Sequence, residues 1–240
     1  MTSPFISVSE LADELAGPTP PAVLDASLIL HTATFDGDYR RESGRPRWVA
    51  GHIPGSQHVD VASQFSDTTS PLHYTHPEPQ AIADELARLG IRKAQHVVVY
   101  DSTGTLWAAR LWYLLTWIGV PTRVLDGGYA AWVAGEQPVE TGEPSPPPDA
   151  ASRPAPADLD PEILERRKEI LELFKSLPLK NHFEVLGVEP GCSDAEVKRA
   201  YTKLAKRYHP DVHRDPRLED LHDVLEGIFI RVGEAWEVLG

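Results

Sequence analysis

Short apolar runs alternate with amphipathic segments over the first half of the chain. The apolar runs predict buried strands, at 22–26, 57–61, 96–100 and 122–126. Apolar residues at helical spacing predict helices, over 8–15, 79–89 and 106–118. The stretch 31–48 is polar and charged and is interpreted as an excursion, and Gly51 to Gly55 form a turn. Strands separated by helices indicate an α/β domain with a parallel sheet that is covered on both faces.

The second half of the chain shows only helical spacing. Asp160 is placed to cap a helix with Pro161 in its first turn, and apolar residues continue this helix to Leu177. We expect this helix to pack either on the helices that follow or on the first half. Those later helices are predicted around 182–186, at 193–208 and over about 217–239. Gly227 and Gly233 should weaken the last one by about 1 kcal/mol each relative to alanine.

Proline dominates the stretch that joins the two halves. This composition predicts a semi-extended linker over 141–159 that holds two domains apart. The expected organisation is a domain over 1–140, the linker, and an all-helical region over 160–240. A length of 240 residues suits two modest domains.

The overall charge narrows the range of partners. A formal net charge of −13 argues against binding to nucleic acid or to an anionic membrane, since both are polyanions. The sequence has no run of about 18 apolar residues, so no membrane span is expected. The first residues lack the basic and then apolar pattern of a secretory signal. We therefore expect a cytoplasmic protein.

Neither a metal ion nor another cofactor is expected. The histidines show no repeated ligand spacing, and Pro210 interrupts any helix between His209 and His213. The single cysteine, Cys192, excludes an internal disulfide framework and multi-cysteine metal sites. It precedes a helix start, where the pKa of a thiol can be lowered, but no base or second cysteine is near in sequence. We interpret Cys192 as incidental.

One helix is strongly basic against this acidic background. The segment from Ser193 to Asp211 opens with a capping box, formed by Ser193 and Glu196, and its apolar residues share one face. Five basic residues crowd the other faces: Lys198, Arg199, Lys203, Lys206 and Arg207. Pro210 ends the helix, so that His209 and Asp211 stand at a turn. Taken alone, this pattern favours a solvated basic helix followed by a turn, because charge runs are usually solvated.

With its flanks, however, the segment resembles the J domain of DnaJ-like co-chaperones. The matching blocks are HFEVLGV at 182–188, the basic helix, the tripeptide His209-Pro210-Asp211, and GEAWEVL at 233–239. The resemblance implies that the protein binds a DnaK-type chaperone ATPase and stimulates its ATP hydrolysis. It implies that the five basic side chains meet an acidic surface on that partner, and that the tripeptide triggers hydrolysis. Two departures stand out: the chain stops at Gly240, where a fourth short helix is usual, and 212–223 is unusually long and acidic.

The first half resembles the rhodanese domain, from about 6 to 139. WVAGHIPGSQHV at 48–59 is close to one family signature, with Trp48 where Phe or Tyr is usual and Ser56 where Ala is usual. VLDGGYAAW at 124–132 matches a second recurrent stretch. The phrases VLDAS, SDTTSPL and VVVYDSTG make the chain similar to the first, non-catalytic half of tandem thiosulfate or mercaptopyruvate sulfurtransferases.

The rhodanese resemblance implies where a nucleophile would stand. Active members place a cysteine directly after the strand at 96–100, and backbone amides favour its thiolate, which carries sulfur as a persulfide. Here Asp101 occupies that position, so we expect no catalytic residue. A carboxylate has no sulfur to offer and would repel thiosulfate. We expect Asp101 to satisfy the loop amides instead; a nucleophile of the phosphate-transfer type would lack a supporting acid or lysine motif.

The candidate loop site on this domain follows from the same comparison. It consists of Asp101, Ser102, Thr103, Gly104 and Arg110. Arg110 is expected to pair with a carboxylate, face a partner or serve the structure. The helix at 106–118 also carries three tryptophans. In tandem sulfurtransferases this half packs against a catalytic half that is missing here, so an apolar surface is expected to be exposed or covered by self-association or another protein.

Three functions fit these observations. The first is a J-domain co-chaperone whose catalytically inactive rhodanese-like module binds an unidentified client or partner protein. The alternative is a sulfurtransferase of the thiosulfate or 3-mercaptopyruvate type, or a non-catalytic half of one. The third is a fused or truncated remnant without an activity of its own.

Overall fold

The computed structural model describes residues 3–36, 38–91, 95–143, 160–209 and 215–240. These residues form two compact units, one before residue 144 and one from residue 160 onward. The predicted linker lies outside the described residues from 144 to 159. Its first residues belong to the first unit, because the Gly142 amide donates to the Val49 carbonyl (2.9 Å) and Glu143 pairs with Arg45 (2.8 Å).

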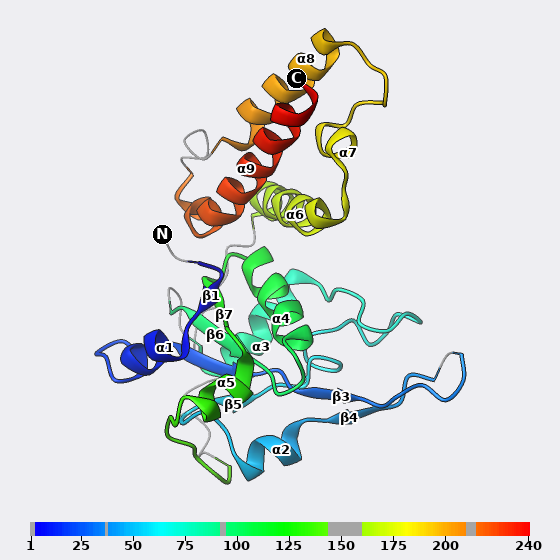
Figure 1. Ribbon diagram of the computed structural model, residues 1–240. Helices are drawn as coiled ribbons and strands as arrows, with labels where there is room; N and C mark the ends of the chain where they lie inside the picture. The colour runs from blue at the N-terminus through cyan, green and yellow to red at the C-terminus, as the bar shows by residue number, and fades with distance from the viewer. Residues whose placement is uncertain (1–2, 37, 92–94, 144–159, 210–214) are drawn as a thin grey trace. The chain divides into compact units, whose positions relative to one another are not determined.

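The first unit is built on a five-stranded sheet whose neighbouring strands are all parallel (Figure 1). Its strands are Phe5–Ile6 (β1), Ala22–Asp25 (β2), Gln57–His58 (β5), Val97–Tyr100 (β6) and Thr122–Leu125 (β7). They lie in the order β1-β7-β6-β2-β5, so β6 is central, and Val98 pairs with Val23 on one side and Arg123 on the other. All of β6 is buried, as expected for a central parallel strand. The strand predicted at 57–61 is shorter than expected.

Helices cover both faces of this sheet, as predicted (Figure 1). They are Val8–Leu15 (α1), Arg45–Ala50 (α2), Pro79–Arg88 (α3), Leu106–Trp117 (α4) and Gly128–Ala134 (α5). Leu11 of α1 and Trp132 of α5 join one core cluster with Val98 and Tyr100 of β6. Because side chains alternate across a strand, Val97 and Val99 of β6 face the opposite layer, where α4 packs on β6 and β7.

The polar stretch 31–48 contains regular structure that the pattern did not predict. Strand Leu28–Leu30 (β3) pairs antiparallel with Arg41–Ser43 (β4), and α2 follows. Gly44 directly follows β4 and lies against Ser27, which directly precedes β3. The Gly44 amide donates to the Ser27 carbonyl (3.1 Å), and a Cβ on Gly44 would lie 2.2 Å from the same oxygen. The strands were missed because β4 has no buried residue, so its sequence lacks an apolar alternation.

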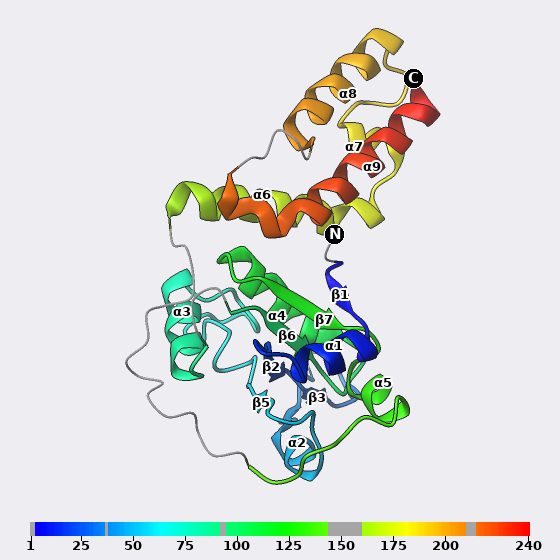
Figure 2. The same ribbon diagram turned by 90° about the vertical axis from the view of Figure 1, so that its left-hand side faces the viewer.

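The second unit is entirely helical in its described residues. Its helices are Pro161–Ser176 (α6), His182–Leu186 (α7), Asp194–Tyr208 (α8) and His222–Leu239 (α9), with 3₁₀ turns at Leu177–Leu179 (η2) and Pro216–Leu221 (η4). Helices α6, α7 and α8 all pack on α9 (Figure 2). Of the two packing partners considered for α6, the helices that follow it are therefore confirmed. The last α-helix begins at His222, later than predicted, because the six residues before it form the 3₁₀ turn.

Gly227 of α9 has a packing role that propensity alone did not predict. A Cβ at this position would lie 2.8 Å from Cε2 of Phe174 in α6, so the ring rests where a side chain would be. Gly233 in the same helix has open space at the corresponding point. Across the described parts of both units, we find no helix with the length and apolar character needed to cross a bilayer.

Candidate functional site

The Asp101 carboxylate lies at the carboxyl end of the central strand β6 and is almost fully buried. One oxygen accepts hydrogen bonds from the amides of Thr103 (2.8 Å) and Thr105 (2.9 Å). The other accepts from the amides of Trp107 (3.0 Å) and Ala108 (2.9 Å), in the first turn of α4. The amides expected to favour an anion therefore do so, and the anion is the side chain of Asp101 itself.

The loop that carries these amides is held in an unusual conformation. Gly104 has φ of +94° and Thr105 has φ of +74°, and Thr105 stands at the N-cap of α4. The amide of Ser102 donates to the Ser27 hydroxyl (2.9 Å), which ties the loop to the segment after β2. Left-handed conformations such as that of Thr105 cost energy in non-glycine residues and persist where surrounding bonds enforce them. Here the carboxylate of Asp101 supplies those bonds.

The backbone of Asp101 also fixes the start of α5. Its carbonyl accepts from the Tyr129 amide (3.1 Å), and a Cβ on Gly128 would lie 2.5 Å from that carbonyl oxygen. Gly128 has φ of +58°, so the close approach and the left-handed backbone both require glycine. The packing of this turn on the Asp101 loop was not predicted from the sequence.

A buried polar chain lies beside this loop and was not predicted. The Ser56 side-chain oxygen lies 3.0 Å from Nε1 of Trp48, which donates to it, and 3.0 Å from the Tyr100 hydroxyl. Burial raises the pKa of Tyr100 and that of Asp25, whose Oδ1 accepts from the Ser27 amide (2.7 Å). The sequence did contain a signal from which the bond between Trp48 and Ser56 could have been predicted, because both residues depart from the family signature.

Arg110 lies one turn further along α4 and is largely buried. Its guanidinium donates to the Phe65 carbonyl (3.3 Å) and to the Ser66 hydroxyl (3.2 Å), and its centre lies 5.8 Å from the Tyr74 ring. Burial lowers the pKa of Arg110. Of the three roles considered for Arg110, these contacts match the structural one.

A series of ring contacts links four side chains of this unit. Ring contacts link Tyr39 to His73 (5.1 Å), His73 to Tyr74 (6.1 Å) and Tyr74 to Trp107 (4.8 Å). Three large apolar side chains that are near these rings in sequence are more than half exposed: Phe35 (67%), Leu72 (72%) and Leu106 (58%). Trp107 itself is buried, and neither Trp112 nor Trp117 is classed as exposed, so the tryptophans of this helix do not form an exposed surface.

In the second unit, α8 presents a basic face to solvent. The amide of Ser193 donates to Oε2 of Glu196 (2.9 Å), so the predicted capping pair starts the helix. Val197 and Tyr208 are buried, and Tyr201 stacks on Trp236 of α9 (5.0 Å). Four of the five predicted basic residues lie together on the exposed surface of the helix: Lys198, Arg199, Lys203 and Lys206.

The fifth basic residue, Arg207, differs from the other four in being bonded to α6. Its guanidinium donates to Oε1 of Glu169 in α6 (2.6 Å), and the charge of Glu169 raises the pKa of Arg207. His209 caps the end of α8 in an extended conformation, and its ring meets Phe229 of α9 edge-on (4.9 Å). Pro210 and Asp211, the rest of the predicted tripeptide, lie outside the described residues.

One acidic cluster was not singled out from the sequence. His222, Asp223 and Glu226 each bring a possible ligand atom within 4.8 Å of the others. They lie in the first turns of α9, where the partial positive charge of a helix N-terminus opposes a cation. We therefore assign no metal ion to this cluster.

Comparison with known proteins identifies both units. A family model described as the rhodanese-like domain matches residues 8–135, more than half of the chain. The chain belongs to the rhodanese-like domain family. A second family model, the DnaJ domain, matches residues 181–240, which contain α7, α8 and α9. The protein is thus a rhodanese-like domain joined to a DnaJ domain, as the resemblances implied.

Several similar proteins of known name are sulfurtransferases. The chain is 33% identical to 3-mercaptopyruvate sulfurtransferase of Homo sapiens over 182 residues, which cover 72% of this chain and 56% of that protein. It is 34% identical to thiosulfate sulfurtransferase of Cricetulus griseus over 154 residues, 61% of this chain and 50% of that protein. This rhodanese-like chain spans about half the length of these curated relatives.

The crystal structure of SseA, a 3-mercaptopyruvate sulfurtransferase from Escherichia coli, has a similar fold. It aligns with 99% of this chain and 95% of its own, with a TM-score of 0.54 and 19% identity. At that identity the likeness shows the rhodanese fold alone.

Proposed function

We propose that this protein is a cytoplasmic J-domain co-chaperone that binds a DnaK-type chaperone ATPase and stimulates its ATP hydrolysis. The observation that carries the proposal is the placement of four exposed cations together on the surface of α8, the helix that ends at His209. An acidic protein surface is the complementary partner for such a face. The match of residues 181–240 to the DnaJ domain supports the same function.

The test is single-turnover ATP hydrolysis by a DnaK-type chaperone, with and without this protein. We expect the wild-type chain to accelerate hydrolysis, and the His209→Gln variant to lose the acceleration. His222→Gln is the matched control, because this histidine is exposed at the start of α9 and should keep full activity. Equal activity of the wild type and of His209→Gln would contradict a J-domain mechanism.

The rhodanese-like unit is proposed to be catalytically silent and to bind a client or partner protein. Its nucleophile position holds Asp101, and both oxygens of that carboxylate are already engaged by amides. The exposed side chains of Leu72 and Leu106, next in sequence to the linked rings of His73 and Trp107, suit an apolar partner segment. We expect the double variant Leu72→Ser/Leu106→Ser to bind a labelled unfolded model protein more weakly than the wild type. Val133→Ser, an exposed change on α5, is the control.

The second candidate function is sulfur transfer, which the named relatives favour. It would need a sulfur carrier, and Cys192 is the only cysteine in the chain. A cyanide–thiosulfate assay on the wild type and on Cys192→Ser separates the two functions. We expect no turnover from either, and turnover that survives the loss of Cys192 would overturn the silent assignment of Asp101. A remnant without activity would instead show a poorly cooperative melting transition.

A further inference from the structure

Helix α6 lies outside the matched DnaJ domain, yet it is bonded to both flanks of the chain segment 210–214. The DnaJ match begins at residue 181, whereas α6 spans Pro161–Ser176. On one flank α6 meets the end of α8, and on the other it meets η4. Each flank is held by its own set of charged side chains on α6.

The flank at the end of α8 is held by Glu169 and Arg166. Oε1 of Glu169 accepts from the Arg207 guanidinium (2.6 Å) and from the Tyr208 hydroxyl (2.7 Å). Arg166 donates to Oε2 of Glu169 (2.7 Å) and to the Arg207 carbonyl (3.1 Å), and its guanidinium lies 5.4 Å from the centre of the Tyr208 ring. Both side-chain and backbone groups at the end of α8 are therefore bonded to α6.

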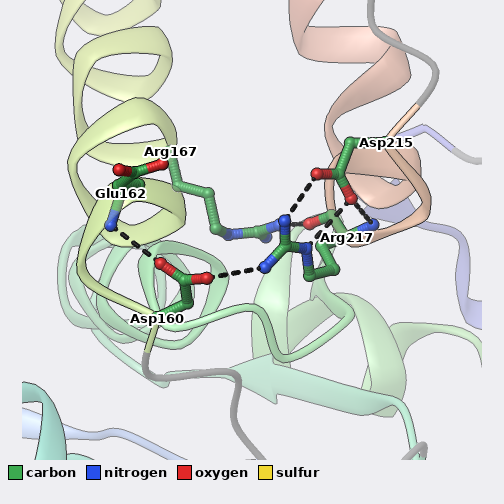
Figure 3. Close-up of polar contacts among 5 residues, drawn as sticks. All are labelled: Asp160, Glu162, Arg167, Asp215 and Arg217. Carbon is green, nitrogen blue, oxygen red and sulfur yellow. Dashed lines mark hydrogen bonds and ion pairs between the residues drawn. The ribbon is translucent and has the colours of Figure 1, made fainter.

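The flank at η4 is held by Arg167 and Asp160, as Figure 3 shows in part. Arg167 is fully buried and donates to both carboxylate oxygens of Asp220 (2.9 and 2.5 Å) and to the Arg217 carbonyl. The Arg217 guanidinium lies between Asp160 at the start of α6 (2.9 Å) and Asp215 (2.8 Å). The acidic segment noted in the sequence thus supplies partners for α6.

The burial of Arg167 indicates that α6 is a fixed part of the unit. A buried guanidinium is tolerated only when its charge is paired and its donors are bonded. The same helix places Phe174 against Gly227 of α9, so apolar packing accompanies the ion pairs. By contrast, the side chain of Arg207 is about half exposed, so its ion pair with Glu169 adds little stability apart from the bonds of Glu169 to Arg166 and Tyr208. The contact between Glu169 and Arg207 is therefore better explained by its effect on the position of the end of α8 than by its contribution to the free energy of unfolding.

We infer that α6 is a working part of the J unit and that Glu169 is a positioning residue in it. Glu169 holds Arg207 and Tyr208 so that His209 leaves α8 in a defined orientation. We call the bonded group of Glu169, Arg166, Arg207 and Tyr208 the brace. Arg207 accordingly belongs to the brace, and the surface that docks on the chaperone, the docking face, consists of the other four cations of α8. This inference rests on the proposed co-chaperone function.

The test is a double-mutant cycle on the full chain, read out by single-turnover ATP hydrolysis of a DnaK-type chaperone at increasing concentrations of this protein. We expect Glu169→Gln and Arg207→Gln each to lower the maximal stimulated rate by about threefold or more, with the half-maximal concentration within about twofold of the wild type. The double variant should match either single variant. Arg207→Lys, which keeps the charge beside Glu169, should restore most of the rate.

Lys206→Gln is the comparison for the docking face. It should raise the half-maximal concentration by about threefold and leave the maximal rate unchanged. If Arg207→Gln instead behaves like Lys206→Gln, or if its effect multiplies with that of Glu169→Gln in the double variant, then Arg207 docks directly and the inference is wrong.

A second readout keeps the inference separate from the proposed function. We expect Glu169→Gln to speed amide hydrogen exchange at the end of α8, residues 204–209, while Glu165→Gln, an exposed change one turn earlier on α6, leaves it unchanged. A wild type that does not stimulate any DnaK-type ATPase would count against the co-chaperone function. Unchanged exchange in Glu169→Gln would overturn the brace, whatever the ATPase result.

Discussion

Trp48 and Ser56 are joined by a buried hydrogen bond, in which Nε1 of the indole donates to the hydroxyl oxygen at 3.0 Å. These are the two positions at which the chain departs from the rhodanese signature. An indole brings a donor that must be satisfied when buried, and a serine brings the acceptor. The two departures therefore form one matched pair, and the same hydroxyl reaches Tyr100 in the central strand (3.0 Å).

The first prediction concerns this pair. Ser56→Ala removes a partner of both Trp48 and Tyr100 inside the core, so we expect it to lower the free energy of unfolding by about 1–3 kcal/mol. Adding Trp48→Phe removes the stranded donor, so the double variant should lose less than the sum of the two single losses. Urea unfolding measures all three variants. Ser102→Ala, an exposed hydroxyl of the same unit, is the control, and additive losses would contradict the pairing.

The second prediction concerns the Asp101 carboxylate. Asp101→Asn replaces one acceptor oxygen by an NH₂ group that would face backbone amides, so about two of the four hydrogen bonds are lost. We expect a loss of about 3 kcal/mol in the free energy of unfolding at neutral pH. Asp126→Asn is the matched control, because Asp126 also follows a strand of the sheet but is exposed. A variant at 101 as stable as the control would show that the amides do not depend on the charge.

The third prediction uses the two glycines of α9. Gly233→Ala should raise the free energy of unfolding of the helical unit by about 1 kcal/mol, because alanine is the better helix former and there is open space at that position. Gly227→Ala gains the same propensity but must displace the Phe174 ring, which lies 2.8 Å from the added carbon. It should therefore be less stable than Gly233→Ala by at least about 1 kcal/mol. Equal stabilisation of both variants in thermal unfolding would show that Phe174 moves aside without cost.

The sequence predicted most elements of both units, because their apolar residues follow strand or helix periods. The hairpin of β3 and β4 was missed for the opposite reason, since its strands bury too little to show a period. The position of Asp101 and its amide partners followed from its place between a strand and a helix. Contacts between residues far apart in sequence could not be predicted in this way. Glu169 with Arg207 and Phe174 with Gly227 depend on how α6 crosses the unit, which no local pattern encodes.

The last prediction is a pH dependence that isolates Glu169. Its neighbours are Arg166 on α6 and Arg207 and Tyr208 on α8. Partial burial acts to raise the pKa of Glu169, but hydrogen bonds from Tyr208 and Arg166 and the two positive charges outweigh it, so the pKa lies below its usual value of 4.5. Below about pH 4.5, Glu169 therefore becomes protonated in the unfolded chain while it is still ionised in the folded protein. The stability that Glu169 contributes is complete above this pH and is lost as the pH falls toward the folded pKa.

Comparison with Glu169→Gln removes the contributions of the other carboxylates. The difference in unfolding free energy between the wild type and this variant should be constant from pH 7 to 6 and should shrink steadily from about pH 5 to pH 4 and below. Urea unfolding at each pH gives the difference, and Glu165→Gln, on the exposed face of the same helix, should differ from the wild type by a small amount that does not change with pH. A difference for Glu169→Gln that stays constant, or grows on acidification, would mean that its carboxylate is not held by Arg166, Arg207 and Tyr208 in solution.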